Sequence, residues 1–215
     1  MNIAFLLISY LIGSIPFSLL IGKLFLNVDV REHGSKNPGA TNAIRVLGRK
    51  WGVPVFFLDV LKGVVPVLII SLGAFNDMFH PLYYGLMAMI GHVYPLFLKF
   101  KGGKAVATSF GVFIAYAPLL GILAGFSFWL SLKLFGWVSI SSTVGAVFLM
   151  GSAWLIYAFG PETGALVSWL SPAGEIALPL VGTVGATIIL IRHKKNYERL
   201  RNKTEPHIKS FKVKK

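Results

Sequence analysis

Six long apolar stretches constrain the fold of this chain more than any other feature of its sequence. They lie near residues 3–26, 52–75, 81–98, 105–134, 137–159 and 174–191. A transmembrane helix needs roughly 20 mostly apolar residues, and several of the stretches reach that length. They are continuous rather than alternating, which disfavours a transmembrane β-barrel. Because only 13% of the residues are charged, we predict an all-α polytopic membrane protein in one compact bundle.

The basic residues gather in three of the remaining segments. These are the loop at 27–51, the turn at 99–104 and the tail at 192–215. The chain has 21 Lys and Arg against 8 Asp and Glu, a balance that in a soluble protein suggests nucleic acid. The loops at 76–80 and 160–173 carry only Asp77 and Glu162 as charges. Since basic residues beside membrane spans mark the cytoplasmic side, we predict contact with anionic membrane lipids and no nucleic-acid partner.

The basic tail also decides the expected number of crossings. The first basic residue, Lys23, comes near the end of the first apolar stretch, the opposite order to a cleaved signal peptide. We therefore expect a retained helix with its N-terminus outside. Six crossings would leave the basic tail outside, but a turn near Pro118 gives seven spans and a cytoplasmic C-terminus. Residues 1–200 are predicted to form one transmembrane domain, followed by a basic cytoplasmic tail at 201–215.

A loop rich in small and polar residues follows the first stretch. Residues 31–45 read REHGSKNPGATNAIR. Glycines allow unusual backbone dihedral angles, and backbone amides in a loop that opens into a helix can hold an anion. We expect Arg45 and Arg49, four residues apart, to share one face of that helix and to grip phosphate. A plain cytoplasmic loop would explain the glycines and Pro38, but less well the density of Asn, Thr and Arg.

A second polar segment lies at residues 100–108, FKGGKAVAT, shortly after the sequence GHVYP at 91–95. Two glycines between lysines, before an apolar helix, suit a phosphate at a helix N-terminus. The spacing is not that of a Walker A loop. From spacing alone, an ordinary turn with interfacial lysines is an equally good interpretation.

The end of the last apolar stretch carries a third polar group. His193, Asn196 and Arg199 recur every third residue, so on a helix they would lie along one side. The alternative is a solvated polybasic tail, which we prefer for residues 209–215. Within the second stretch, Asp59 and Lys62 can pair on one helix face, either as a structural strut or as a substrate contact.

The sequence excludes several kinds of chemistry. It contains no cysteine, so disulfides, thiolate metal sites and acyl-cysteine intermediates are absent. No histidine and carboxylate cluster has metal-ligand spacing, and we expect neither a metal nor a cofactor.

Taken together, the segments resemble the bacterial acyl-phosphate:glycerol-3-phosphate acyltransferase family. The motifs are GSIPF at 13–17, GSKNPGATNAIRVLG at 34–48, LDVLKG at 58–63, GHVYP at 91–95, FKGGKAVAT at 100–108 and HKKNYERL at 193–200. The resemblance implies a seven-helix protein of the bacterial inner membrane with its active site facing the cytoplasm. It also implies transfer of a fatty acyl group from acyl phosphate to the 1-hydroxyl of glycerol 3-phosphate. The products would be lysophosphatidic acid, the first committed phospholipid precursor, and phosphate.

The resemblance also implies the site residues by motif position. The catalytic set is Ser35, Arg45, Lys104 and His193. The substrate-binding set is Gly34, Asn37, Thr41, Asn42, Arg49, Lys101, Gly102, Gly103 and Asn196. Two positions depart from the family pattern, since Lys36 and Lys203 stand where relatives usually have glycine. The His-x4-Asp motif of other glycerolipid acyltransferases is absent, because Pro38 and Phe97 occupy the fifth positions after His33 and His92.

The chemistry leaves the proton acceptor open. Acyl phosphate is already activated, so the protein must mainly hold two anions together and stabilise the developing oxyanion, with Ser35 as a candidate donor. The base is either His193 or the donor's own phosphate, and an acyl-Ser35 intermediate is a third option that lacks a recognisable paired base. Two other classes of protein fit the basic cluster: a transporter for an anionic metabolite and a non-catalytic lipid-binding scaffold.

Overall fold

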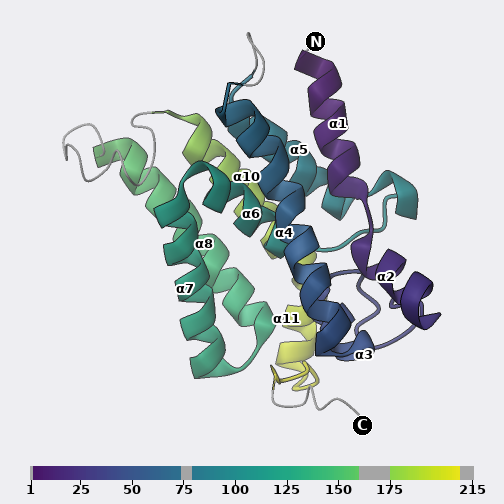
Figure 1. Cartoon of the computed structure of the whole chain (residues 1–215). Coiled ribbons are helices and arrows are strands. Elements are labelled where there is room, and N and C mark those ends of the chain that lie inside the picture. Colours follow the sequence, from purple (N-terminus) through teal and green to yellow (C-terminus); the bar gives the residue numbers. More distant parts are fainter. Residues whose placement is uncertain (1, 74–78, 160–174, 209–215) are drawn as a thin grey trace. The chain divides into compact units, whose positions relative to one another are not determined.

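The computed structural model describes residues 2–73, 79–159 and 175–208, and over these residues it is helical without strands (Figure 1). The all-α prediction is therefore confirmed for the described part of the chain. Asp77, Glu162 and the end of the tail at 209–215 lie outside it. The chain forms two compact units that divide at Val112 and Phe113, and each is described by itself.

The first unit holds the polar loop and the glycine turn of the sequence. Its elements are α1 (Asn2–Ser14), α2 (Phe17–Leu26), α3 (Ala40–Leu47), α4 (Arg49–Ser71), α5 (Pro81–Val93), the short 3-10 helix η1 (Leu96–Leu98) and the first part of α6 (Val106–Tyr116). The chain bends by 44° between α1 and α2. Pro16 lies at this bend, and because a proline lacks the N–H that continues a helix, the bend is expected there.

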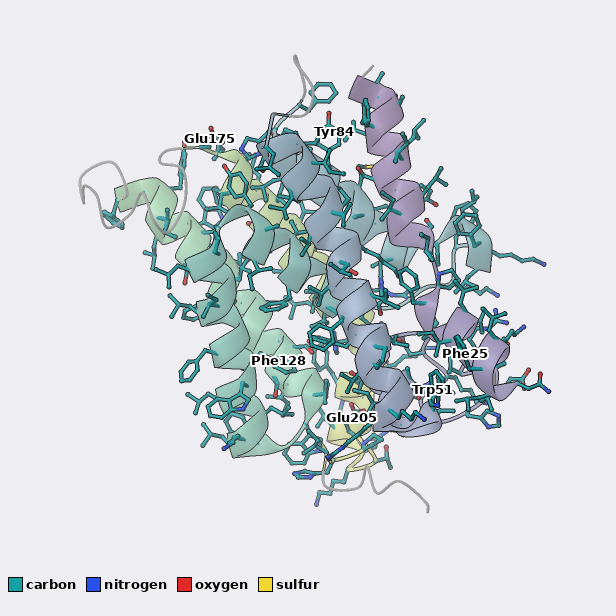
Figure 2. All side chains as sticks on the ribbon, viewed as in Figure 1. Phe25, Trp51, Tyr84, Phe128, Glu175 and Glu205 are labelled. Atoms are coloured by element: carbon teal, nitrogen blue, oxygen red, sulfur yellow. The ribbon has the colours of Figure 1, made fainter. Side chains whose placement is uncertain are left out.

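Small residues let the helices of the first unit approach closely. A Cβ on Gly91 of α5 would overlap the backbone oxygen of Tyr10 in α1, and a Cβ on Gly13 would overlap that of Ala88. Close approach through small residues is the usual basis of helix packing in membranes. At the other end of α2, the ring of Phe25 stacks on Trp51 with centroids 4.9 Å apart (Figure 2).

The second unit contains the rest of α6 and four further helices. These are α7 (Pro118–Phe135), α8 (Val138–Phe159), α10 (Ala177–Arg192) and α11 (Lys194–Arg201). α8 packs against both α7 and α10. The described start of the tail returns to the turn between α7 and α8, where the Ile208 amide donates to the Gly136 carbonyl at 2.8 Å. There His207 also packs edge-on against Trp137.

The division of the 105–134 stretch near Pro118 is confirmed. α6 ends at Tyr116 and α7 begins at Pro118, with the first turn of α7 close to the end of α6 at Ile114. Among the described residues, three helices are long and apolar enough to cross a membrane, namely α4, α7 and α8. The bent pair α1 and α2 would make a fourth, and α6 and α10 are apolar but shorter.

Candidate active site

One buried amide organises the polar loop before α3. The side chain of Asn42 is 2% exposed. Its Oδ1 accepts a hydrogen bond from the Ser35 backbone amide at 2.8 Å. Its Nδ2 donates to the carbonyl oxygens of Val30 at 2.8 Å and His33 at 3.2 Å. Because one residue of α3 satisfies three backbone groups, the loop acquires a fixed shape and presents Ser35 beside the helix start.

Gly34 allows this arrangement. Its φ of 60° lies in the left-handed region, and a Cβ there would overlap Oδ1 of Asn42. The same Cβ would lie 3.3 Å from Cδ of Arg45, so the Arg45 side chain runs over Gly34. The structure thus brings Gly34, Ser35, Asn42 and Arg45 together. Asn37 lies beside Gly39, the residue that precedes α3.

The expectation that Arg45 and Arg49 share one helix face is wrong. α3 ends at Leu47 and α4 begins at Arg49, with Gly48 between them at a φ of 80°. A left-handed glycine ends the first helix and allows the chain to turn into the second. Arg45 is half-buried in α3, whereas Arg49 is exposed at the start of α4.

The glycine turn is held by the end of α5. The Gly103 amide donates to the His92 carbonyl at 3.0 Å, and the Gly102 amide donates to the Val93 carbonyl at 3.1 Å. Both N–H groups predicted to meet phosphate therefore take part in the turn itself. Lys104 follows as a half-buried side chain, whereas Lys101 is exposed.

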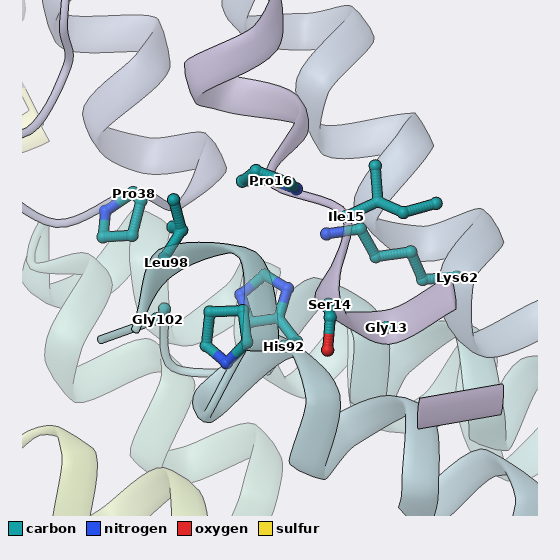
Figure 3. Close-up of a pocket in the computed structure, with 11 residues that line it drawn as sticks. Gly13, Ser14, Ile15, Pro16, Pro38, Lys62, His92, Leu98 and Gly102 are labelled. Atoms are coloured by element: carbon teal, nitrogen blue, oxygen red, sulfur yellow. The ribbon is translucent and has the colours of Figure 1, made fainter. Parts of the chain in front are cut away.

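The loop and the turn meet at a small cavity in the first unit (Figure 3). It encloses about 190 Å³, part of it open to solvent. Its wall comes from the bend between α1 and α2, the polar loop, the glycine turn, α4, the end of α5 and η1. The lining residues are Gly13, Ser14, Ile15, Pro16, Pro38, Lys62, His92, Pro95, Leu98, Gly102 and Gly103. Ser18 anchors the loop side, since its hydroxyl donates to the Pro38 carbonyl at 2.8 Å.

Lys62 and His92 reach this cavity from a buried polar cluster. Lys62 Nζ lies 2.7 Å from Oδ1 of Asp59, so the predicted pairing of Asp59 and Lys62 is confirmed. His92 Nδ1 lies 3.8 Å from the same oxygen and 3.2 Å from the hydroxyl of Thr108.

In the second unit, a carboxylate holds the polar residues of the C-terminal segment, which comprises residues 193–205. Glu205 Oε1 accepts from Asn196 Nδ2 at 2.6 Å, and Oε2 accepts from Arg199 Nε at 2.7 Å. Asn196 and Arg199 therefore do lie on one side of α11, as their spacing predicts. No role is predicted for Glu205 from the sequence (labelled in Figure 2), because a single acidic residue in a basic tail gives no local signal of its partners.

His193 stands where α10 passes into α11. Its Nδ1 lies 2.8 Å from the carbonyl oxygen of Ile189. A carbonyl accepts only, so the Nδ1 nitrogen of His193 carries the proton that it donates to Ile189.

Most of the predicted site residues of the first unit thus occupy one loop, one turn and the start of α3. Arg49 and Lys101 stand apart as exposed residues, while His193 and Asn196 belong to the second unit. Apolar helices joined by such polar and cationic segments define the chain as an integral membrane protein.

Comparison with known proteins gives the family. Residues 3–203 match the model of the glycerol-3-phosphate acyltransferase family. A Listeria monocytogenes glycerol-3-phosphate acyltransferase is 45% identical over 204 residues, covering 94% of each chain. One from Bacillus subtilis is 43% identical and covers 97% of this chain and 99% of the relative. The chain belongs to the glycerol-3-phosphate acyltransferase family and is an acyltransferase.

Solved structures agree with this assignment. The fold is similar to that of PlsY, an integral membrane glycerol 3-phosphate acyltransferase, in its glycerol 3-phosphate form. That match has a TM-score of 0.82 and 33% identity, and covers 96% of this chain and 94% of the other. The lysophosphatidic acid form of PlsY gives a TM-score of 0.77 and 32% identity over the same shares of both chains.

Proposed function

We propose that this acyltransferase moves a fatty acyl group from acyl phosphate to the 1-hydroxyl of sn-glycerol 3-phosphate. The products are lysophosphatidic acid and inorganic phosphate, and the reaction is the first step of phospholipid synthesis. The observation that carries the proposal is that the polar loop, through Pro38, and the turn, through Gly102 and Gly103, line one cavity in the first unit. Membership of the family and likeness to PlsY in its glycerol 3-phosphate and lysophosphatidic acid forms support it.

The residues of the first unit bind and orient the anionic groups. Both substrates carry phosphate, so their approach is opposed by charge repulsion that Arg45 and Lys104 offset. Ser35 donates to the carbonyl oxygen as negative charge develops there. The supporting residues of the loop and turn are Gly34, Asn37, Thr41, Asn42, Gly102 and Gly103. The exposed cations Arg49 and Lys101 raise the local concentration of anionic substrate.

The reaction forms one carbon–oxygen bond and breaks another. The glycerol oxygen attacks the acyl carbon, the bond between that carbon and the phosphate oxygen breaks, and phosphate leaves with the electron pair. The hydroxyl proton passes to the departing phosphate or to a protein base, for which the family motif offers His193. The hydrogen bond between Nδ1 and the Ile189 carbonyl fixes the orientation of the His193 ring. Asn196, fixed by Glu205, binds substrate beside His193 in the C-terminal segment.

An assay in liposomes tests the function directly. Purified protein receives acyl phosphate and labelled glycerol 3-phosphate, and the label is followed by mass spectrometry of the lipid fraction. Labelled lysophosphatidic acid is the expected result. Label trapped inside the vesicles without lipid product would indicate a transporter, and neither outcome would indicate a binding scaffold.

Variants of two cations connect the activity to the site. Arg45→Ala and Lys104→Ala should each lower transfer by at least about 100-fold, since each removes a charge-assisted contact to phosphate. Arg201→Ala and Lys133→Ala remove exposed cations elsewhere and serve as matched controls. Full activity in both site variants, with unchanged melting temperatures, would rule out these roles.

The membrane arrangement is proposed on the distribution of charge. The chain crosses the bacterial inner membrane seven times, with its N-terminus outside and its C-terminus and active site on the cytoplasmic side. Since the chain lacks cysteine, single cysteines at His33, Lys99 and Lys195 can be labelled individually in sealed vesicles. All three positions are exposed and should react from the cytoplasmic side. Labelling of any one from the opposite side would break the arrangement.

A further inference from the structure

Four buried polar side chains from three helices form one cluster beneath the glycine turn. Asp59 and Lys62 come from α4, His92 from α5 and Thr108 from α6. Their exposed fractions are 2%, 3%, 7% and 0%. The contacts join them in a chain, from Lys62 Nζ to Asp59 Oδ1 at 2.7 Å, from that oxygen to His92 Nδ1 at 3.8 Å, and from His92 Nδ1 to the Thr108 hydroxyl at 3.2 Å.

Such a cluster is a poor way to stabilise a fold. Removing an ion pair from water costs several kcal/mol per ion, and packed apolar side chains of similar volume are often equally stable or better. Placing either charged side chain within an apolar membrane helix also costs free energy. The ring of Phe17 lies 5.0 Å from Lys62 Nζ, which offsets a small part of it. The contacts of the cluster with the turn indicate what it does there.

The imidazole of His92 forms the floor of the glycine turn. A Cβ on Gly103 would overlap Nε2 of His92, and a Cβ on Gly102 would overlap the His92 carbonyl oxygen. The same carbonyl accepts the Gly103 amide at 3.0 Å. The turn therefore rests on both the backbone and the ring of His92. The ring is thus close enough to Gly103 that its orientation bears on the placement of the adjoining Lys104.

We infer that Asp59, Lys62, His92 and Thr108 are positioning residues that fix the His92 ring and thereby the placement of Lys104. The inference rests on the proposed function, in which Lys104 binds a substrate phosphate. Thr108 lies within hydrogen-bond distance of His92 Nδ1, the Asp59 carboxylate lies 3.8 Å from the same nitrogen, Lys62 compensates the charge of Asp59, and Nε2 faces the turn. None of the four needs to touch substrate for this role.

The kinetic pattern of Lys104→Arg supplies the reference for the test. Arginine keeps the charge but moves it, so this variant should raise KM for the one substrate whose phosphate Lys104 holds. Thr108→Val should raise KM for that same substrate about fivefold, the value of one hydrogen bond, and His92→Leu should raise it by about tenfold or more. The KM for the other substrate should stay within about twofold of the parent.

The ion pair supplies a rescue that tells positioning from folding. Asp59→Asn and Lys62→Met each leave one buried charge uncompensated, so both should lower the yield of folded protein. The double variant removes both charges and should recover the yield. Its KM should nevertheless stay raised for the reference substrate, because a neutral amide in place of the Asp59 carboxylate holds His92 less firmly. Thr183→Val is the control, since it removes a hydroxyl that donates to the Pro179 carbonyl and accepts from the Trp154 indole in the other unit.

The outcomes separate two failures. If the parent protein makes no lysophosphatidic acid, the proposed function fails first. If the parent is active, and Thr108→Val and the double variant fold with both KM values unchanged, the positioning role is wrong. Equal increases in both KM values would likewise reduce the cluster to a structural element. If His92→Leu does not fold, Thr108→Val decides, because that substitution is isosteric.

Discussion

The polar loop before α3 and the C-terminal segment after α10 are each held in place by one polar side chain, but the chemistry of that side chain differs. In the loop, the neutral amide of Asn42 gathers three backbone groups of residues 30–35. In the C-terminal segment, the carboxylate of Glu205 gathers two side chains, one of them cationic. An amide that both donates and accepts suits backbone partners, whereas a carboxylate only accepts and suits donors. The hydrogen bonds of Asn42, which we call the neutral tie, should thus be insensitive to salt. Those of Glu205, the charged tie, should weaken as the salt concentration rises.

The largest effect should follow from breaking the neutral tie. In Asn42→Asp the carboxylate can still accept from Ser35, but it cannot donate to the carbonyls of Val30 and His33. We expect a loss of about 3–5 kcal/mol in the free energy of unfolding, since two buried acceptors lose their donor beside a new charge. Thermal melting in detergent measures it. Asn202→Asp, at an exposed position, should change stability by no more than about 0.5 kcal/mol.

The charged tie should cost less to break. Glu205→Gln keeps one acceptor for Asn196 but loses the charge-assisted bond to Arg199, for a loss of about 1.5–3 kcal/mol. Transfer activity should fall with it, because Asn196 loses its fixed position. The difference in melting temperature between the parent and this variant should be smaller in high salt than in low salt. An equal difference at both salt concentrations would refute the contrast between the two regions. Glu198→Gln, on an exposed part of α11, is the control.

Replacing one left-handed lysine by glycine should stabilise each of the two regions to a similar extent. Lys36 in the loop and Lys203 in the C-terminal segment both have left-handed backbones, with φ of 58° and 56°. Lys36→Gly and Lys203→Gly should each stabilise by about 1 kcal/mol, because glycine carries no penalty there. Lys133→Gly, inside helix α7, should instead destabilise by up to about 1 kcal/mol. Unchanged or lowered melting temperatures for the first two would contradict the expectation.

The smallest effect concerns the charged contact at the rim of the loop. The Arg31 guanidinium is hydrogen-bonded to Asp29 and holds the pKa of that carboxyl well below its usual range. A lowered pKa in the folded state means that the contact stabilises fully above about pH 4 and loses its effect as the pH falls further. Arg31 is 41% exposed, so Arg31→Ala should cost at most about 1 kcal/mol at pH 7. The difference from the parent should shrink progressively in melts taken at pH values below about 4.

Residue patterns predict some parts of this molecule and not others. Pro118 marks a helix boundary because proline fixes the backbone locally, and the spacing of Asn196 and Arg199 places them on one side because helices are periodic. The same periodicity does not apply to Arg45 and Arg49, because Gly48, with its positive φ, ends one helix before the next begins. The role of Glu205 depends on a turn after α11 that brings it back to Asn196 and Arg199, and the role of His92 depends on contacts with α4 and α6. No local pattern encodes such contacts.

The return of the tail to the turn between α7 and α8 has a practical consequence for handling the protein. Because the Ile208 amide and the His207 ring both contact that turn, residues beyond the end of α11 take part in the packing of the second unit. A fluorescent reporter or purification tag joined at residue 201 would cut this anchor from the chain that carries His193 and Asn196. The same fusion placed after residue 215 leaves the anchor whole, so it is the safer design for expression and labelling work.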